Sequence, residues 1–527
     1  MTVMGPTGAA PVEVTTRFGR LRGASDGRVA TFKGIPYAAA PLGPMRFKPP
    51  APLTPWAGVR EAFQFGPQSL QTSADLALMG DSTVIGMMFE PPENTFNSED
   101  CLYLNVWTPA GGGRHPVMFW CHSGGFFSGS GAMPHCDGAN LAAAGQVVVV
   151  TVNHRLGLLG FLHLHDLAGD AYLGAGNAGL LDLAAALTWV RENVAAFGGD
   201  PDNVTLFGES GGGAKVGALM SMPRAGGLFH RAIIQSGAWA RYREPEDATD
   251  IAAAVLEHLG LDRGNTRSLS DVPAKRILEA QHVSMKRLMG RPQPIDGSIT
   301  DRHLGPVRDA AVLPYHPRSV PALKLSAHVP LLMGTNRDEG TFFLSADPEL
   351  YSLDEAGLLA RVQGLLGERA ADVIESYRRL SPRATPTDWM IEIMTDEIIR
   401  MPSIAQVERR LAVRSAPVYM YVFAYETDVM GGRLRSPHGV EIPFVFDNVV
   451  ADPFAGSDPR RFELAKCVSG AWAEFARSGR PACSKLPEWP AYESQNRATM
   501  VLDIVSEVVH DPERERRLIW RDLLQHP

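Results

Sequence analysis

VTLFGESGG, residues 204–212, is the stretch that decides the fold of this 527-residue chain. Its first half, residues 204–207, is a mainly apolar stretch with a β-branched residue at each of its first two positions, which predicts a strand. Its second half fits the pattern Gly-x-Ser-x-Gly, and a helix of small residues is expected from about Gly212. A serine at a sharp turn from strand to helix exposes its hydroxyl, because the flanking glycines let the backbone turn without Cβ clashes. The stretch therefore predicts Ser210 as a nucleophile on an α/β sheet.

Further apolar runs surround this stretch and alternate with helical patterns. Residues 116–120, 147–152, 329–333 and 418–423 suit strands of a mainly parallel sheet. Residues 177–197 have apolar side chains at three- and four-residue steps, which predicts a helix. The alternation predicts an α/β fold with a mainly parallel central sheet flanked by helices.

The domain organisation is predicted from linkers and insertions within this alternation of strands and helices. No linker rich in proline, glycine or serine marks a boundary, so residues 1–527 are expected to form a single domain. Residues 244–327 and 353–414 are rich in helical patterns. We expect these two segments to be helical insertions over the active site.

The composition excludes several function classes. The chain carries 50 Lys and Arg against 58 Asp and Glu, for a net charge of −8, and has no basic patch typical of nucleic-acid binding. No apolar run approaches the roughly 18–20 residues that span a bilayer, and residues 1–6 lack the features of a secretory signal. The five cysteines form no Cys-x-x-Cys pair, which favours free thiols in a reducing cytosol. We therefore expect a cytoplasmic protein without metal or cofactor that binds neither nucleic acid nor membranes.

A second glycine-rich loop, His122-Ser123-Gly124-Gly125-Phe126, follows the predicted strand at 116–120. Backbone N–H groups in such a loop can bind the oxyanion of a tetrahedral intermediate, and glycines let the substrate approach closely. The rival interpretation of residues 208–215 as a phosphate-binding loop fails, because Ala214-Lys215 stands where Lys-Ser or Lys-Thr is required. The two loops together predict an acyl-transfer site.

The general base is predicted from chain order. In α/β-hydrolases the order is serine, acid, histidine, and after residue 339 only His438, His510 and His526 remain. His526 is next to the end of the chain, and His510 begins a polar loop. His438 lies in a turn soon after the predicted strand at 418–423, and α/β sites form at the carboxyl ends of strands. His438 is therefore the preferred base.

The orienting acid should follow an earlier buried strand. The run at 329–333 leads into Gly-Thr-Asn-Arg-Asp-Glu-Gly at 334–340. Asp338 and Glu339 both lie in this loop. The pattern of the residues does not choose between them.

With these parts in place, the chain resembles the type-B carboxylesterase family, which includes bacterial para-nitrobenzyl esterases, animal carboxylesterases and cholinesterases. The resemblance runs from about residue 18 to residue 492. The matching stretches occur in order and are FKGIPYA at 32–38, RFKPP at 46–50, SEDCLYLNV at 98–106, VNHRLG at 152–157 and FGGDP at 197–201. GES at 208–210 follows at the expected place.

The resemblance implies a role for each site residue. The triad acid is implied to be Glu339, because GTNRDEG resembles the family motif in which the glutamate has this role, and HGVEIPF at 438–444 resembles the histidine motif. The oxyanion donors carried over are the N–H groups of Gly124, Gly125 and Gly211. Glu209 and Ser236 match polar positions that support the triad histidine.

The chain also departs from the family pattern. Ser123 takes the place of the first of three usual glycines, and Gly211 replaces a usual alanine; neither change removes an expected donor. Ser69 stands where a cysteine partner for Cys101 is common, which supports a cytosolic enzyme. The segment 69–101 has methionines but no tryptophan, so a cholinesterase-like cation site is not expected. The residues expected to line a substrate pocket are Met88, Phe126, Phe127 and Trp239. The alternative, that such residues pack in the core or in a lid, stays open.

These expectations combine into one functional hypothesis. We expect a serine carboxylic-ester hydrolase that forms an acyl-enzyme on a small to medium, neutral, apolar or aryl ester. Carbamate or amide hydrolysis with the same triad is the alternative, and a non-catalytic binding protein on the same fold is a third hypothesis. The expected partner is a small-molecule ester, and the chain is expected to be a monomer or homodimer.

Overall fold

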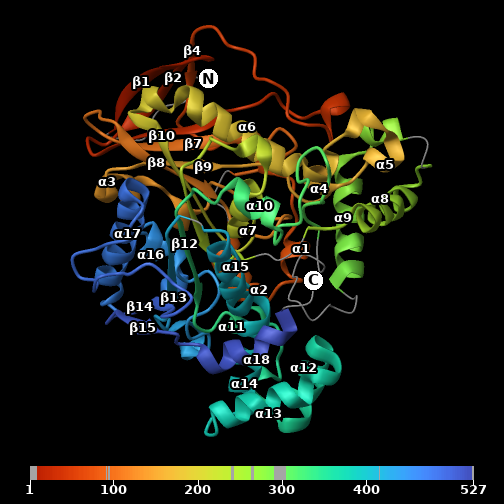
Figure 1. Cartoon of the computed structure of the whole chain (residues 1–527). Coiled ribbons are helices and arrows are strands. Elements are labelled where there is room, and N and C mark those ends of the chain that lie inside the picture. Colours follow the sequence, from red (N-terminus) through yellow and green to blue (C-terminus); the bar gives the residue numbers. More distant parts are fainter. Residues whose placement is uncertain are drawn as a thin grey trace.

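A large central sheet organises the protein (Figure 1). The computed structural model of the chain describes residues 9–90, 92, 95–238, 242–262, 266–289, 304–414 and 416–524. Within them the strand order is β1-β2-β3-β7-β9-β8-β10-β11-β12-β13-β14-β15, with β4 (Val59–Glu61) paired to β2. A separate pair is formed by β5 (Gln68–Ser69) and β6 (Asn97–Ser98).

The middle of the sheet is parallel and its edges are antiparallel. The parallel strands are β9 (Val148–Val152), β8 (His115–Cys121), β10 (Gly199–Glu209), β11 (Arg231–Gln235), β12 (Leu331–Asn336), β13 (Val418–Phe423) and β14 (Ala498–Leu502). The antiparallel edge strands are β1 (Ala10–Thr16), β2 (Gly19–Ser25), β3 (Val29–Pro36), β7 (Tyr103–Pro109) and β15 (Glu507–His510). The prediction of a mainly parallel central sheet flanked by helices is therefore confirmed.

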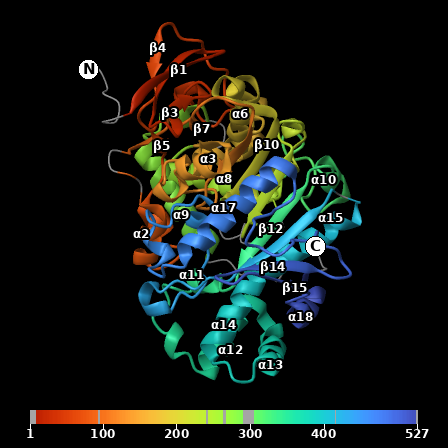
Figure 2. The same ribbon diagram turned by 90° about the vertical axis from the view of Figure 1, so that its left-hand side faces the viewer.

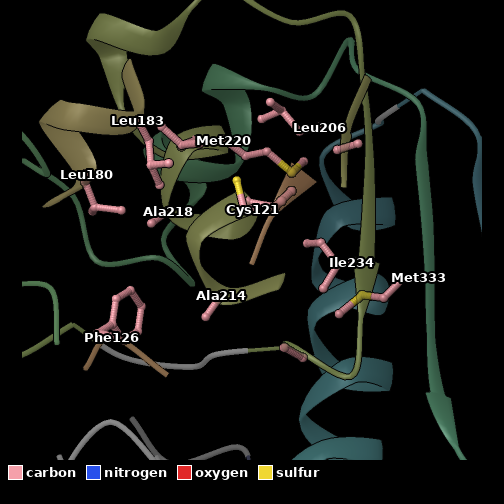
Figure 3. Packing of buried hydrophobic residues seen from close by; sticks show 14 of the residues in the cluster. Cys121, Phe126, Leu180, Leu183, Leu206, Ala214, Ala218, Met220, Ile234 and Met333 are labelled. Atoms are coloured by element: carbon pink, nitrogen blue, oxygen red, sulfur yellow. The ribbon is translucent and has the colours of Figure 1, made fainter. Parts of the chain in front are cut away.

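Helices cover both faces of the parallel strands. In β8, Val117 and Phe119 belong to a core that includes α6 (Ala178–Asn193) and α7 (Gly211–Met220). Figure 3 shows part of this core, where helical leucines and alanines pack against Leu206 and Ile234 of β10 and β11.

The intervening residues of β8, Met118 and Trp120, belong to a second core with α3 (Ala139–Gly145) and α17 (Arg461–Ser478). Side chains alternate across a strand, so a strand covered on both faces needs apolar residues at every position. This is why residues 116–120 form an unbroken apolar run.

Element boundaries shift where tertiary pairing overrides the local pattern. The helix expected at 177–197 ends as an α-helix at Asn193 and continues as a 3₁₀ turn, Val194–Phe197. The strand expected at 204–207 is longer, because β10 pairs with β8 from Gly199 onward. The strand expected at 329–333 lies at Leu331–Asn336 instead.

Helices beyond the sheet follow β11 and β12. After β11 come α8 (Pro245–Leu259), α9 (Ala274–Met289) and α10 (Val320–Leu325). After β12 come α12 (Glu355–Leu366), α13 (Ala370–Leu380), α14 (Pro386–Thr395) and α15 (Met401–Ala412). Figure 2 shows α12, α13 and α14 grouped at one end of the molecule, near α18 (Arg514–Leu524). The shorter helices are α1 (Ser73–Leu76), α2 (Ser82–Phe89), α4 (Gly157–Phe161), α5 (His165–Ala168), α11 (Gly340–Phe343) and α16 (Ile442–Val445).

Within the described ranges, one helical region has the length and apolar composition of a membrane span. It covers Asp170–Phe197 and contains α6. However, 83% of its most apolar window is buried inside the protein. A core helix of a globular fold has the same properties, so this region is weak evidence for a membrane span.

Candidate active site

Ser210 lies at a strained turn between β10 and α7. Its φ and ψ are 54° and −123°, a conformation that non-glycine residues adopt only when their surroundings impose it. Its backbone N–H donates to the carbonyl of Gln235, 2.9 Å away. A Cβ on Gly208 would lie 2.5 Å from the carbonyl carbon of Gly212. A Cβ on Gly212 would lie 2.0 Å from the carbonyl oxygen of Cys121. The turn therefore requires glycine on both sides of the serine, as the Gly-x-Ser-x-Gly pattern predicts.

His438 and Glu339 form a buried hydrogen-bonded pair. Nδ1 of His438 lies 2.6 Å from Oε2 of Glu339. The other oxygen of Glu339, Oε1, accepts from the hydroxyl of Ser236 and from the backbone N–H of Asn336, both at 2.6 Å. These contacts fix the carboxylate and orient the imidazole. Nε2 of His438 makes no hydrogen bond within the described part of the chain.

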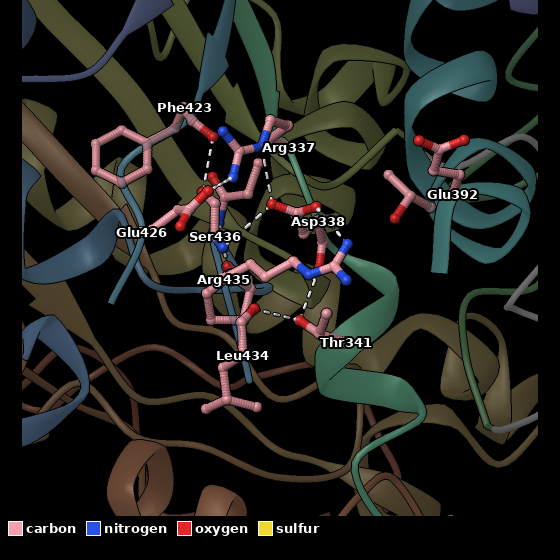
Figure 4. Close-up of polar contacts among 12 residues, drawn as sticks. Arg337, Asp338, Thr341, Glu392, Phe423, Glu426, Leu434, Arg435 and Ser436 are labelled. Carbon is pink, nitrogen blue, oxygen red and sulfur yellow. Dashed lines mark hydrogen bonds and ion pairs between the residues drawn. The ribbon is translucent and has the colours of Figure 1, made fainter. Parts of the chain in front are cut away.

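The structure distinguishes the two acids that the residue pattern left open, and Glu339, the acid implied by the family resemblance, is the one in contact with His438. The carboxylate of Asp338 lies 2.9 Å from the guanidinium of Arg337 and 3.9 Å from that of Arg435 (Figure 4). Its backbone N–H donates to the carbonyl of Ser436 at 2.9 Å. Asp338 therefore joins the acid loop to the histidine loop, while Glu339 contacts the imidazole.

The other histidines that the sequence offered as the base are His510 and His526. His510 is an exposed residue at the end of β15. His526 lies outside the described residues.

A second carboxylate, Glu209, lies on the other side of the imidazole. Its Oε1 is 3.2 Å from Nε2 of His438. Its Oε2 accepts from the hydroxyl of Ser123 at 2.6 Å. Ser123, which departs from the family pattern, thus links the glycine loop at 122–126 to the carboxylate beside the histidine.

A third buried carboxylate, Glu441, completes the cluster, and the sequence analysis gave it no role. Its oxygens accept from the side-chain amides of Asn336, at 2.6 Å, and Gln235, at 3.2 Å. The amide of Asn336 also donates to the carbonyl of Pro437, next to His438, at 2.7 Å. The sequence signal that could have identified Glu441 was its position three residues after the histidine.

The electrostatics of the cluster favour a charged imidazole. Burial by itself would lower the pKa of His438, but the carboxylates of Glu209 and Glu339 outweigh it and raise that pKa to about 9. Burial raises the pKa of Glu209 and of Glu441 above the usual range for a glutamate. The site therefore concentrates negative charge around one histidine, which stabilises its protonated form.

The glycine loop lies directly against the start of α7. Gly124 and Gly125 have φ values of 90° and 60°, and a Cβ on Gly211 would overlap the backbone of Gly125. The N–H groups of Gly124 and Gly125 donate no hydrogen bond to any residue that the structure describes. Unpaired donors next to Ser210 are what an oxyanion site needs.

The candidate pocket residues fall into different environments. Met88 is buried, and its side chain lies against Gly439, next to the histidine. Phe126 is buried edge-to-face on Phe161, with ring centroids 5.1 Å apart. Phe127 is fully buried in a core cluster with α4 and α9. Trp239 lies outside the described residues.

Two phenylalanines that the sequence analysis did not select also flank the histidine. The ring centroids of Phe342 and Phe343 lie 5.5 and 4.9 Å from that of His438. Both belong to α11, which starts directly after Glu339. Among the described residues, no group of three or more His, Cys, Asp or Glu side chains has a metal-binding arrangement.

Comparisons with known proteins identify the family of the chain. A sequence model described as "Carboxylesterase family" matches residues 10–520. The para-nitrobenzyl esterase of Bacillus subtilis (strain 168) is 38% identical over 510 residues, which are 96% of this chain and 97% of that protein. The phenmedipham hydrolase of Pseudarthrobacter oxydans is 33% identical over 97% of this chain and 99% of that protein. The structure of a Geobacillus stearothermophilus carboxylesterase superposes with a TM-score of 0.81 at 41% identity, covering 96% of this chain and 99% of that one.

Proposed function

Because the chain belongs to the carboxylesterase family, has the α/β-hydrolase fold and is an ester-hydrolysing enzyme, we propose that Ser210 is its nucleophile. His438 is the general base and Glu339 the orienting acid. The observation that carries the proposal is the 2.6 Å contact between Nδ1 of His438 and Glu339. It leaves Nε2 as the nitrogen that can accept a proton.

The reaction has two acyl transfers. His438 takes the proton of the Ser210 hydroxyl while the oxygen attacks the ester carbonyl, and a tetrahedral oxyanion forms. The imidazolium then gives that proton to the leaving alcohol, which departs as the acyl-enzyme forms. Water attacks the acyl-enzyme with His438 again as base, and the acid leaves with Ser210 restored.

The oxyanion is bound by backbone donors. The N–H groups of Gly124, Gly125 and Gly211 have this role, and each donor in such a site contributes about 10²–10³ in rate. Glu339 and Glu209 stabilise the imidazolium that forms when the serine is deprotonated, while Ser236 holds Glu339 in place.

The substrate is a small to medium ester with an apolar or aryl group. Support comes from Met88, Phe342 and Phe343, which place apolar side chains around the histidine. Hydrolysis of carbamates or amides by the same triad is the second candidate, and the 33% identical phenmedipham hydrolase is consistent with it. A non-catalytic binding protein is not retained, since the family comparisons support an ester-hydrolysing enzyme.

The experiment compares the wild type with Ser210→Ala and Ser221→Ala. Ser221 ends the same helix, α7, that Ser210 begins, so it is a matched control. Hydrolysis of a short-chain para-nitrophenyl ester and the intact mass after a fluorophosphonate probe are measured. We expect Ser210→Ala to lose both hydrolysis and the adduct, and Ser221→Ala to retain both. Normal activity in folded Ser210→Ala would overturn the assignment of the nucleophile.

A further inference from the structure

A lysine is buried beneath the glycine loop. Lys215 belongs to α7 and is 0% exposed. Its Nζ donates to the backbone carbonyl of His122 at 2.8 Å. The same nitrogen lies 5.8 Å from the ring centroid of Phe126. Lys215 thus contacts both ends of the segment 122–126 that carries the two unpaired glycine N–H groups.

Helix geometry explains why this lysine reaches the loop. Residues four apart on an α-helix lie on the same face, so Gly211 and Lys215 both point toward segment 122–126. Gly211 packs on the backbone of Gly125, and Lys215 reaches the carbonyl of His122 one turn later. One face of α7 therefore contacts the loop at two places.

The environment of Lys215 is unfavourable for a lysine. Burial lowers its pKa to about 7, although the Cys121 thiol and Glu209 act in the opposite direction. An amine and an ammonium both carry N–H groups, so the bond to His122 persists in either protonation state. A buried lysine destabilises a fold unless its polar atoms are satisfied. The carbonyl of His122 is the hydrogen-bond acceptor that satisfies Nζ among the residues described.

We propose that Lys215 is a positioning residue that holds segment 122–126 against α7, so that the N–H groups of Gly124 and Gly125 point at the substrate oxyanion. This inference rests on the proposed function, because the loop matters only if an oxyanion forms beside Ser210. Lys215 acts through the backbone of His122 and does not touch the reacting atoms. Its contribution belongs to the tetrahedral intermediate and the transition states that lead to and from it, since the bound ester carries no oxyanion.

The test replaces Lys215 with methionine, which keeps the length and apolar stem but removes the donor. Val216→Ala is the matched control, because it removes buried methyl groups from the adjacent position of α7. For Lys215→Met we expect kcat to fall by about 10- to 100-fold with KM changed less than about 2-fold. We also expect weaker inhibition by an alkyl trifluoromethyl ketone, in parallel with the loss of kcat, because its serine adduct carries the same oxyanion.

Two results would overturn the proposal. One is a kcat of Lys215→Met within about 2-fold of that of Val216→Ala. The other is a fall in kcat without any change in inhibition by the ketone. If Lys215→Met does not fold, kcat and inhibition by the ketone are measured instead for Lys215→Gln, which keeps a shorter hydrogen-bond donor. Loss of folding in both variants would assign the lysine to core stability and reject the positioning role.

The outcome is separable from the test of the nucleophile. If Ser210→Ala retains hydrolysis, the proposed function fails, whatever the Lys215 variants do. If Ser210→Ala is inactive and Lys215→Met keeps full activity, the function stands and the role of the lysine fails.

Discussion

Two groups of acidic side chains meet at the loop that follows β12, and their charges are compensated differently. The first group, Glu209, Glu339 and Glu441, surrounds His438 and otherwise accepts hydrogen bonds from neutral donors. The second group is centred on Asp338, which faces the guanidinium groups of Arg337 and Arg435 (Figure 4). Arg337 also pairs with Glu426, and Arg435 with Asp388.

The difference shows that the same chemical group is neutralised by arginines in one group and placed beside a histidine in the other. A carboxylate matched by arginines is satisfied in the resting protein and contributes to loop geometry. Buried carboxylates that are hydrogen-bonded mainly to neutral donors are not neutralised by an arginine or lysine. Their negative charge therefore acts on the histidine and raises the pKa of His438. We therefore expect substitutions in the first group to change rate and pH dependence, and those in the second to change stability.

The largest expected effect is that of Glu339→Gln. An amide cannot stabilise the imidazolium or fix its tautomer as a carboxylate does, so kcat/KM for a para-nitrophenyl ester should fall by about 10³- to 10⁴-fold. Asp338→Asn, at the adjacent position, should keep kcat/KM within about 10-fold of the wild type. Equal losses in the two variants would remove the distinction between the two groups.

Glu209→Gln should shift the pH dependence. A carboxylate 3.2 Å from Nε2 favours the protonated imidazole, so its removal lowers the pKa of His438. The base must be neutral to accept the serine proton, so the acid limb of kcat/KM against pH should move to lower pH. Glu441→Gln should move it in the same direction by less, because its oxygens face Asn336 and Gln235. An unchanged acid limb in Glu209→Gln would contradict the charge assignment.

Asp338→Asn should act on stability. The change removes the anion that faces two arginines and weakens the link between the acid and histidine loops. The Arg337 side chain is 37% exposed, so water screens part of the interaction. The expected loss is about 1–2 kcal/mol in the free energy of unfolding, measured by urea denaturation. A stability equal to the wild type would show that the backbone bonds to Ser436 hold the loops alone.

The smallest effect is expected for Glu426→Gln. This glutamate pairs with Arg337, but its side chain is 62% exposed. Exposed ion pairs contribute little, so the unfolding free energy should change by less than about 0.5 kcal/mol and kcat/KM should not change measurably. A loss as large as that of Asp338→Asn would mean that the arginine cluster acts as one cooperative network.

The sequence predicted those parts of the site whose geometry is local. Ser210 could be assigned because its turn depends on the glycines on either side of it. The strands beside it could be assigned because a sheet covered on both faces requires unbroken apolar runs. Boundaries were less predictable, as at β10, because pairing with β8 lengthens the strand beyond its apolar run.

The candidate site as a whole depends on contacts that the sequence pattern does not encode. Glu441 and Lys215 lie in stretches that were already singled out, but their roles follow from what faces them in space. Glu441 accepts from Gln235, and Lys215 donates to His122, across large separations in the chain. No periodicity links such positions.

By itself the sequence determined the α/β fold class and the turn at Ser210. It also determined which two loops, those with the acid at 334–340 and with His438, had to meet that turn. Local backbone conformation and apolar periodicity are properties of neighbouring residues, and they are visible in one dimension. The residue pattern left Asp338 and Glu339 open, and the family resemblance implied Glu339. Only the tertiary structure shows that Glu339 meets the imidazole, because that contact depends on how the acid loop pairs with a loop 99 residues further along the chain. Adjacent side chains of one loop point in different directions, so a single step in the sequence separates a carboxylate at the histidine from one held by arginines.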